Sequence, residues 1–259
     1  MEYFEKLEKN PYEDLKWNVP ERSQGTVNVI GGNTSRFRDE VKVAEFLTRT
    51  YPVQEVRLVV PDVLKGKLPD LPNFVFLPST DSGGFAESQE LMDVFNTVDC
   101  NLVLGDLSKN KVTGRAVANA VKNSSKMTLL TRDTVDALTD NAPERWLMNE
   151  NVAVMASIAQ LQKLLRAVYY PKMLLMTSSL VQIADVLHKF TLSYPIAIVS
   201  LHNGQVLVAK NGVLKAVALE KTGYSPMLFW NGEIAGKIIG INIYNPNQFI
   251  EATVNAIFE

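Results

Sequence analysis

The sequence contains little of what covalent cross-links and metal centres require. Its 259 residues include one cysteine, Cys100, and two histidines, His188 and His202. One cysteine cannot form a disulfide within the chain, and three such side chains are too few for the usual structural zinc sites. We therefore expect no intrachain disulfide and no structural metal. The scarcity of cysteine also suits the reducing conditions of the cytoplasm.

Long apolar runs and an excess of charge of either sign are also missing. No apolar stretch approaches the roughly 20 residues that a membrane-spanning helix requires. The first nine residues are charged and lack the apolar segment of a signal peptide. The formal net charge is −2, which provides no broad basic surface for nucleic acid or anionic lipid. We expect a cytoplasmic protein with no membrane and no nucleic acid partner.

Short apolar segments alternate with amphipathic ones through the first half of the chain. The segments predicted as strands are 26–30, 55–60, 73–77, 101–104 and 127–130. Between them, apolar residues recur at helical spacing, as in Phe37, Val41, Ala44 and Leu47. Such alternation favours a parallel sheet with right-handed crossovers and helices on both faces.

The pattern becomes antiparallel in the last third of the chain. The predicted elements are helices at 152–168 and 179–190, strands at 196–201, 205–209 and 213–219, and helices at 233–241 and 247–258. Asn203-Gly204 and Asn211-Gly212 join the three strands. Asn-Gly is the strongest short hairpin signal, because both residues accept positive φ. His202 precedes the first of these turns, and we expect its side chain to be exposed.

Together these patterns predict an α/β fold with three layers, α/β/α. Its sheet is mainly parallel, with an antiparallel C-terminal meander. We find neither a linker nor a repeat, so we expect a single domain over residues 1–259. Residues 1–24 form an N-terminal arm whose aromatic side chains cover the body of the same subunit or of a neighbour: Tyr3, Phe4, Tyr12 and Trp17.

In an open parallel sheet, ligands bind beyond the carboxyl ends of the strands. The residues at those ends here are Gly31-Gly32-Asn33, Asp62, Gly105-Asp106, Thr131-Arg132-Asp133 and Ser200-Leu201-His202. Gly31 and Gly32 allow the backbone to approach a ligand, but the dinucleotide fingerprint and the P-loop lysine are absent. Structural explanations stay open for several of these residues. Asn33 or Thr34 is also a helix N-cap candidate, and Asp133 is an N-cap candidate or an acid suited to a first helical turn. The same ambiguity applies to Asp106.

The segment from Phe229 to Gly236 is the most informative, because it places Asn231-Gly232-Glu233 directly before an apolar helix. Its Ile234-Ala235-Gly236 is similar to the Leu-Ala-Gly of ADP- or ATP-dependent NAD(P)H-hydrate dehydratases, a branch of the ribokinase-like superfamily. Val29-Ile30-Gly31-Gly32-Asn33 resembles the family's Gly-Gly strand end, and Leu102 to Leu107 stands where the family has Gly-Pro-Gly-Leu-Gly. The resemblance runs from about Pro20 to Glu259.

This resemblance implies a ribokinase-like fold, ADP or ATP with Mg²⁺ as cofactor, and NAD(P)H hydrate as the molecule acted on. It implies that nucleotide phosphates lie at Asn231 and Gly232, with Ser200 nearby. The residues implied for the substrate cleft are Gly31, Gly32, Asn33, Gly105 and Asp133. Assembly into a homo-oligomer is implied as well.

The family's catalytic groups are largely replaced in this sequence. Gly232 stands where the family has its catalytic Asp, so Glu233 is the candidate base. Thr131 replaces the first Asp of an Asp-x-Asp pair, and residues 147–152 keep none of the His, Pro or Gly of a Thr-Pro-His-Pro-Gly-Glu loop. Two hypotheses follow. The chain is either a nucleotide-dependent lyase or kinase with an altered site, or a non-catalytic protein that binds a nucleotide-like ligand or a protein partner.

Overall fold

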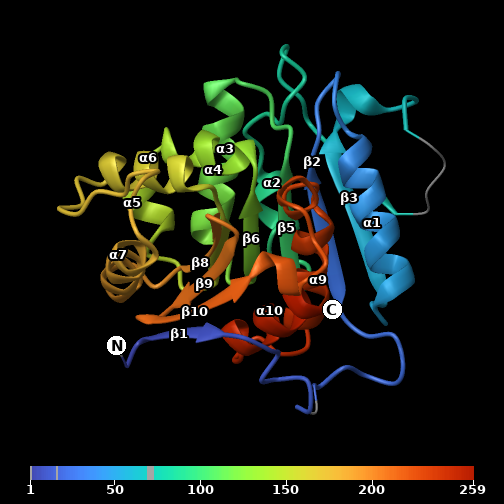
Figure 1. Cartoon of the computed structure of the whole chain (residues 1–259). Coiled ribbons are helices and arrows are strands. Elements are labelled where there is room, and N and C mark those ends of the chain that lie inside the picture. The colour runs from blue at the N-terminus through green and yellow to red at the C-terminus, as the bar shows by residue number, and fades with distance from the viewer. Residues whose placement is uncertain (1, 16, 69–72) are drawn as a thin grey trace.

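A computed structural model describes residues 2–15, 17–68 and 73–259 (Figure 1). Within this part of the chain, one sheet has ten strands in the order β1-β10-β9-β8-β7-β6-β5-β2-β3-β4. The strands are β1 (Phe4–Leu7), β2 (Thr26–Gly31), β3 (Glu55–Pro61), β4 (Phe74–Leu77), β5 (Cys100–Gly105), β6 (Met127–Thr131), β7 (Val152–Met155), β8 (Ala197–His202), β9 (Gln205–Lys210) and β10 (Val213–Ala218).

The sheet is mainly parallel. Neighbours from β4 through β8 pair in parallel, whereas β9 pairs antiparallel with both β8 and β10. The two turns of this meander contain Asn203-Gly204 and Asn211-Gly212, and all four residues have positive φ. These are the predicted hairpins, whose left-handed residues match the twist of the flanking strands.

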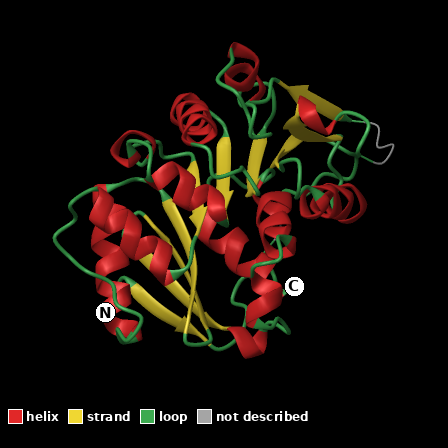
Figure 2. Ribbon diagram, turned by 90° about the horizontal axis from the view of Figure 1, so that it is seen from above, coloured by secondary structure: helices red, strands yellow, loops and turns green. Residues whose placement is uncertain are grey.

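Helices cover both faces of the sheet (Figure 2). The helices are α1 (Arg38–Thr50), α2 (Gln89–Val94), α3 (Lys111–Asn123), α4 (Asp133–Thr139), α5 (Pro143–Trp146), α6 (Ile158–Ala167), α7 (Leu180–Ser193), α8 (Pro226–Phe229), α9 (Glu233–Asn242) and α10 (Phe249–Phe258). Buried side chains of α2 to α7 form one core with the sheet, and those of α1, α9 and α10 form the other. The predicted three-layer α/β/α fold is confirmed.

The helix predicted over residues 152–168 is wrong in its first part. Residues 152–155 form β7, a strand between β6 and β8, and the helix α6 begins only at Ile158. The apolar run Val152 to Met155 continues the spacing of the following helix, so periodicity alone cannot separate the two elements. The capping box of Ser157 and Gln160 marks the true helix start.

The environment of His202 also differs from the expectation. This side chain is 4% exposed, and its Nε2 lies 2.9 Å from the carbonyl oxygen of Ser178. The loop before α7 covers this end of the hairpin, a long-range contact that the turn sequence does not encode.

The N-terminal arm packs against its own chain. Its strand β1, which the sequence analysis did not predict, pairs in parallel with the edge strand β10. The Tyr3 ring stacks on His188 with centroids 3.8 Å apart, and Tyr12 and Trp17 pack against the core on the α10 side. No helix in the described residues is both long enough and apolar enough to cross a bilayer.

Candidate functional site

Two glycine-rich strand ends meet at the carboxyl edge of the sheet. Gly31 ends β2 and Gly32 follows it, Gly105 ends β5, and the amide of Gly32 donates to the carbonyl oxygen of Gly105 at 3.1 Å. A Cβ at Gly31 would lie 2.5 Å from that same oxygen. The two backbones therefore approach more closely than any side chain at position 31 allows, which explains why a glycine is needed there.

Asn33 and Asp133 hold the loops around these glycines. Asn33 Nδ2 donates to the carbonyl oxygen of Asp106 at 2.7 Å. The Asp133 carboxylate accepts the amides of Asp106 and Leu107 at 2.7 and 3.3 Å. The polar atoms of both predicted cleft residues are therefore engaged with the loop that follows β5.

A charged bridge, which we call the Arg132 bridge, crosses the same edge. Arg132 Nη1 lies 2.8 Å from Asp39 Oδ2 of α1, and its Nη2 lies 3.3 Å from Asp106 Oδ2. Burial raises the pKa of Asp106, an effect that the charge of Arg132 partly offsets. A cavity of about 450 Å³ lies here, lined by Ser35, Arg36, Phe37, Arg38, Asp39, Asp106 and Arg132.

Backbone strain accumulates at the Arg132 bridge. Asp106 and Arg132 have φ values of 53° and 55°, the left-handed region that side chains other than glycine rarely adopt. Such residues cost about 1–3 kcal/mol each and cluster at functional sites. Sequence reasoning noted Thr131-Arg132-Asp133 as a strand end but assigned the functional role to Asp133 alone. Nothing in the sequence predicts that the backbone of Arg132 adopts a left-handed conformation.

Glu40, on the first turn of α1, is a second residue that the sequence analysis missed. Its side chain is 0% exposed, and neither carboxyl oxygen has a hydrogen-bond partner among the described residues. Burial raises its pKa to about 8. Its own backbone amide, close to the carboxyl, and the charge of Arg132 lower the pKa, whereas the charges of Asp106 and Asp39 raise it. A carboxyl buried in this way is a candidate functional group.

The N-terminus of α9 lies at this edge as well. Gly232 is the N-cap residue, with φ 99°, and a Cβ there would lie 3.0 Å from side-chain atoms of both Leu104 and Val43. Leu104 directly precedes Gly105, so the structure brings Gly232 and Glu233 to the end of β5. Asn231 Oδ1 accepts the Glu233 amide at 2.9 Å. The amides of Ile234 and Ala235, in the same turn, have no intrahelical acceptor.

Ser200 stands apart from these residues. It lies in β8, which β6 and β7 separate from β5, so the two strands are roughly 14 Å apart at the usual strand spacing. The side chain is 0% exposed, and its Oγ has no partner among the described residues.

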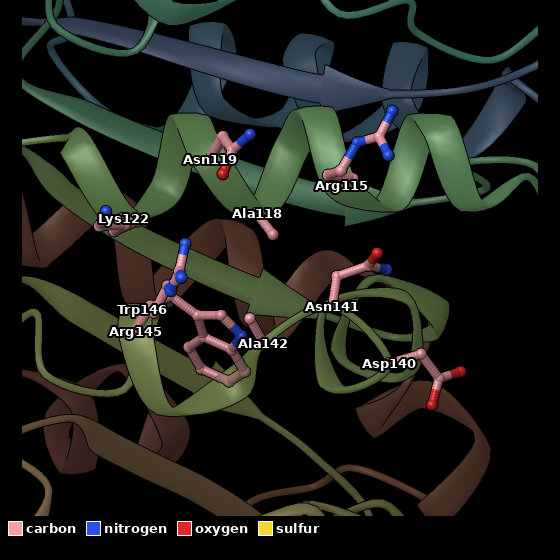
Figure 3. Close-up of a pocket in the computed structure, with 9 residues that line it drawn as sticks. All are labelled: Arg115, Ala118, Asn119, Lys122, Asp140, Asn141, Ala142, Arg145 and Trp146. Atoms are coloured by element: carbon pink, nitrogen blue, oxygen red, sulfur yellow. The ribbon is translucent and has the colours of Figure 1, made fainter.

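A second cavity lies away from the strand ends, in the outer helix layer (Figure 3). It has a volume of about 380 Å³ between α3 and the segment around α5, with Arg115, Lys122 and Arg145 among its lining residues. The strand-end rule, the buried carboxyl and the strained loops all favour the edge near Gly105 as the candidate site. Across the described residues, no group of three or more His, Cys, Asp or Glu side chains is placed to hold a metal ion.

No protein-family profile matches the sequence, and no curated protein is similar to it. Solved structures share its fold. A ribokinase-like superfamily protein from Enterococcus faecalis is 13% identical, with a TM-score of 0.68 over 100% of this chain and 86% of its own. YxkO of Bacillus subtilis, a member of the UPF0031 family, is 14% identical, with a TM-score of 0.62 over 93% of this chain and 82% of its own.

An ADP complex of Bacillus subtilis pyridoxal kinase is a third structure of this shape. It is 11% identical, with a TM-score of 0.52 over 90% of this chain and 89% of its own. At these identities the likeness establishes the fold, which is ribokinase-like.

Proposed function

We propose that this chain binds ADP or ATP, with Mg²⁺ carried by the phosphates, at the N-terminus of α9. The observation that carries the proposal is the first turn of that helix. The amides of Ile234 and Ala235 have no intrahelical acceptor, and Gly232 places no side chain in front of them. A helix N-terminus of this kind favours phosphate through its amides and its dipole. Pyridoxal kinase, which has the same fold, forms an ADP complex.

Asn231 and Ser200 are the other residues predicted to contact the nucleotide, and they differ in how accessible they are. Asn231 is exposed next to the helix start and can contact phosphate. Ser200 is kept as a proposed nucleotide contact because its hydroxyl has no partner among the described residues. Because the side chain is buried, the groups that cover it must move before the hydroxyl can contact a ligand.

Replacing Asn231 by Asp is expected to weaken ADP binding about tenfold. Asp keeps the cap on the Glu233 amide, so the helix start is preserved, but it adds a negative charge next to the phosphates. Isothermal titration with ADP and Mg²⁺ measures the affinity. Asn211→Asp is the matched control. It makes the same charge change in the β9–β10 turn, at the opposite end of the strands, and should leave the affinity unchanged. Equal losses in both variants would place the phosphates elsewhere.

We further infer that NAD(P)H-hydrate dehydration is weak or absent, which favours the non-catalytic alternative. Gly232 supplies no carboxylate, and Glu233, one helical step later, points roughly 100° away. Loss of one preorganised stabilising group typically costs about 10²–10³ in rate, and several groups are missing here. Turnover of NADH hydrate with ADP or ATP and Mg²⁺ is the measurement. Robust turnover abolished by Glu233→Gln would refute this inference and identify Glu233 as the base.

Self-association into a dimer or a larger assembly also remains a proposal. The resemblance to dehydratases that assemble suggests it, and β1 leaves a short strand at one edge of the sheet. Sedimentation velocity at micromolar concentration should give a mass at least twice the 28.8 kDa of one chain. A species at the mass of one chain would remove the proposal.

A further inference from the structure

The amino ends of the parallel strands line a cavity at the edge of the sheet opposite Gly105. It has a volume of about 250 Å³, and its lining includes the first residues of four neighbouring strands: Cys100, Met127, Val152 and Ala197. Lys210, the last residue of the antiparallel strand β9, lines it as well. Another cavity, of about 430 Å³, adjoins it, because five residues line both: Glu150, Asn151, Lys210, Pro246 and Phe249. We call the two cavities together the amino-edge cleft.

Lys210 occupies a position of β9 that faces the core. Side chains alternate between the two faces of a strand. Val206 and Val208 are fully buried in the core that α1, α9 and α10 form with the sheet, and Lys210 continues this alternation. Its Nζ lies 5.3 Å from the centre of the Phe249 ring of α10. The ammonium group therefore lies against a side chain that the two cavities share.

The ammonium group of Lys210 has no anionic partner. Lys163, Lys189 and Lys215 each form an ion pair with a carboxylate, whereas Lys210 forms neither an ion pair nor a side-chain hydrogen bond with any residue that the structure describes. Burial lowers its pKa, and the charge of Glu150 partly offsets this effect. A partly buried cation loses hydration that nothing here replaces, and an anion bound in the cleft would supply the missing partner.

We propose that the amino-edge cleft binds a small organic acid that has one carboxylate and an apolar body. The carboxylate contacts the ammonium group of Lys210. The body packs against apolar side chains that line the smaller cavity: Met127, Val152, Ile243, Pro246 and Phe249.

The charges of the cleft favour a single carboxylate over a phosphate. In the smaller cavity two lysines, Lys126 and Lys210, are balanced by Asp99 and Glu150. Asp99 is already engaged, since its Oδ2 accepts the amide of Thr26 at 2.9 Å. A monoanion compensates the one cation that has no partner, whereas a phosphate dianion would add a second negative charge close to Glu150.

This inference does not rest on the proposed function. Ile243, which lines the smaller cavity, is the C-cap residue of α9, whereas the proposed phosphate site lies at the other end of that helix. The ten residues of α9 separate the two sites by roughly 15 Å at 1.5 Å per residue. An acid in the cleft and a nucleotide at the start of α9 can therefore be bound at the same time.

The test compares benzoate with benzamide, which has the same ring but no charge. The full chain, carrying ¹³C in the methyl groups of isoleucine and methionine, is titrated with each probe and followed by NMR. Benzoate should shift the signals of Ile243 and Met127 but not that of Met173, which is exposed before α7. It should bind at least tenfold more tightly than benzamide and more tightly than phenyl phosphate.

Three outcomes of these titrations would overturn the proposal. The first is no shift of Ile243 and Met127 at millimolar benzoate. The second is equal or tighter binding of benzamide or phenyl phosphate. The third is displacement of benzoate by saturating ADP, which would place the acid at the start of α9 instead.

Variants of Lys210 separate recognition from packing. Lys210→Met removes the charge but keeps an unbranched stem on Phe249, so it should weaken benzoate binding at least tenfold and leave benzamide binding unchanged. Lys210→Gln keeps a donor without the charge and should show the same loss. Chemical denaturation of ligand-free Lys210→Met should give a free energy of unfolding no lower than that of the wild type, because an unpaired cation has been removed.

Lys122→Met is the matched control, since it makes the same change at an exposed position of α3. It should leave the affinity for benzoate unchanged. Wild-type affinity in both Lys210 variants, or an equal loss in Lys122→Met, would refute the role of Lys210.

Discussion

Replacing Gly31 by Ala is expected to destabilise the protein by about 2–4 kcal/mol, combining overpacking with backbone strain. The added Cβ would lie 2.5 Å from the carbonyl oxygen of Gly105 and 2.8 Å from Glu40 Oε1, both well inside normal contact. The carbonyl belongs to the central strand β5 and cannot retreat without breaking the sheet. Chemical denaturation of the variant and the wild type measures the difference in the free energy of unfolding.

Gly66→Ala is the matched control for this variant. Gly66 also has a positive φ, 79°, but no atom lies within 4 Å of its Cβ position. The free energy of unfolding of this variant should fall by only about 1 kcal/mol, which is the cost of placing alanine in the left-handed region. If the two variants are equally destabilised, the close approach of β2 and β5 is not what requires glycine at position 31.

Much of the fold could be predicted because its signals are local. The Asn-Gly turns and the short apolar strands specify the meander and the parallel strands from neighbouring residues alone. β7 was not predicted, because its four residues continue the apolar spacing of α6 and were assigned to that helix. β1 was missed because its stability comes from pairing with β10, about 200 residues away in the sequence, and its alternation over four residues is too short to predict a strand.

In the candidate site, the sequence indicated only the positions that depend on backbone conformation, which are the glycines at the strand ends. The expectation that ligands bind at strand ends selected Gly31, Gly32 and Gly105, and the structure brings these three glycines close together. Roles for Glu40 and Arg132 were not predicted, because a charged residue in a segment of mixed charge is usually solvated. Whether such a residue is buried depends on how α1 meets β2 and β5, which no spacing in the sequence reveals. Asp133 was selected for its charge, yet its carboxylate serves two backbone amides.

The wild-type protein is expected to lose stability as the pH rises from about 5 to 7.5, and Glu40→Gln should remove most of that loss. In the unfolded chain Glu40 ionises near the ordinary glutamate value of 4.5, whereas in the folded protein burial raises its pKa to about 8. Between these values the folded state holds a proton that the unfolded state has released. Stability therefore falls by at most about 1.4 kcal/mol per pH unit, or about 3 kcal/mol between pH 5 and 7.5.

The pH dependence of unfolding, rather than the absolute stability, isolates this effect. Gln cannot ionise, so any fixed cost of burying its amide is the same at every pH. Urea denaturation of both proteins at half-unit steps from pH 5 to 8.5 gives the difference in slope. Glu90→Gln, the same change at an exposed position of α2, should keep the wild-type slope. Parallel curves for the wild type and Glu40→Gln would mean that Glu40 ionises as readily in the folded chain as in the unfolded one. Its carboxyl would then be in contact with water or with a donor in the folded protein.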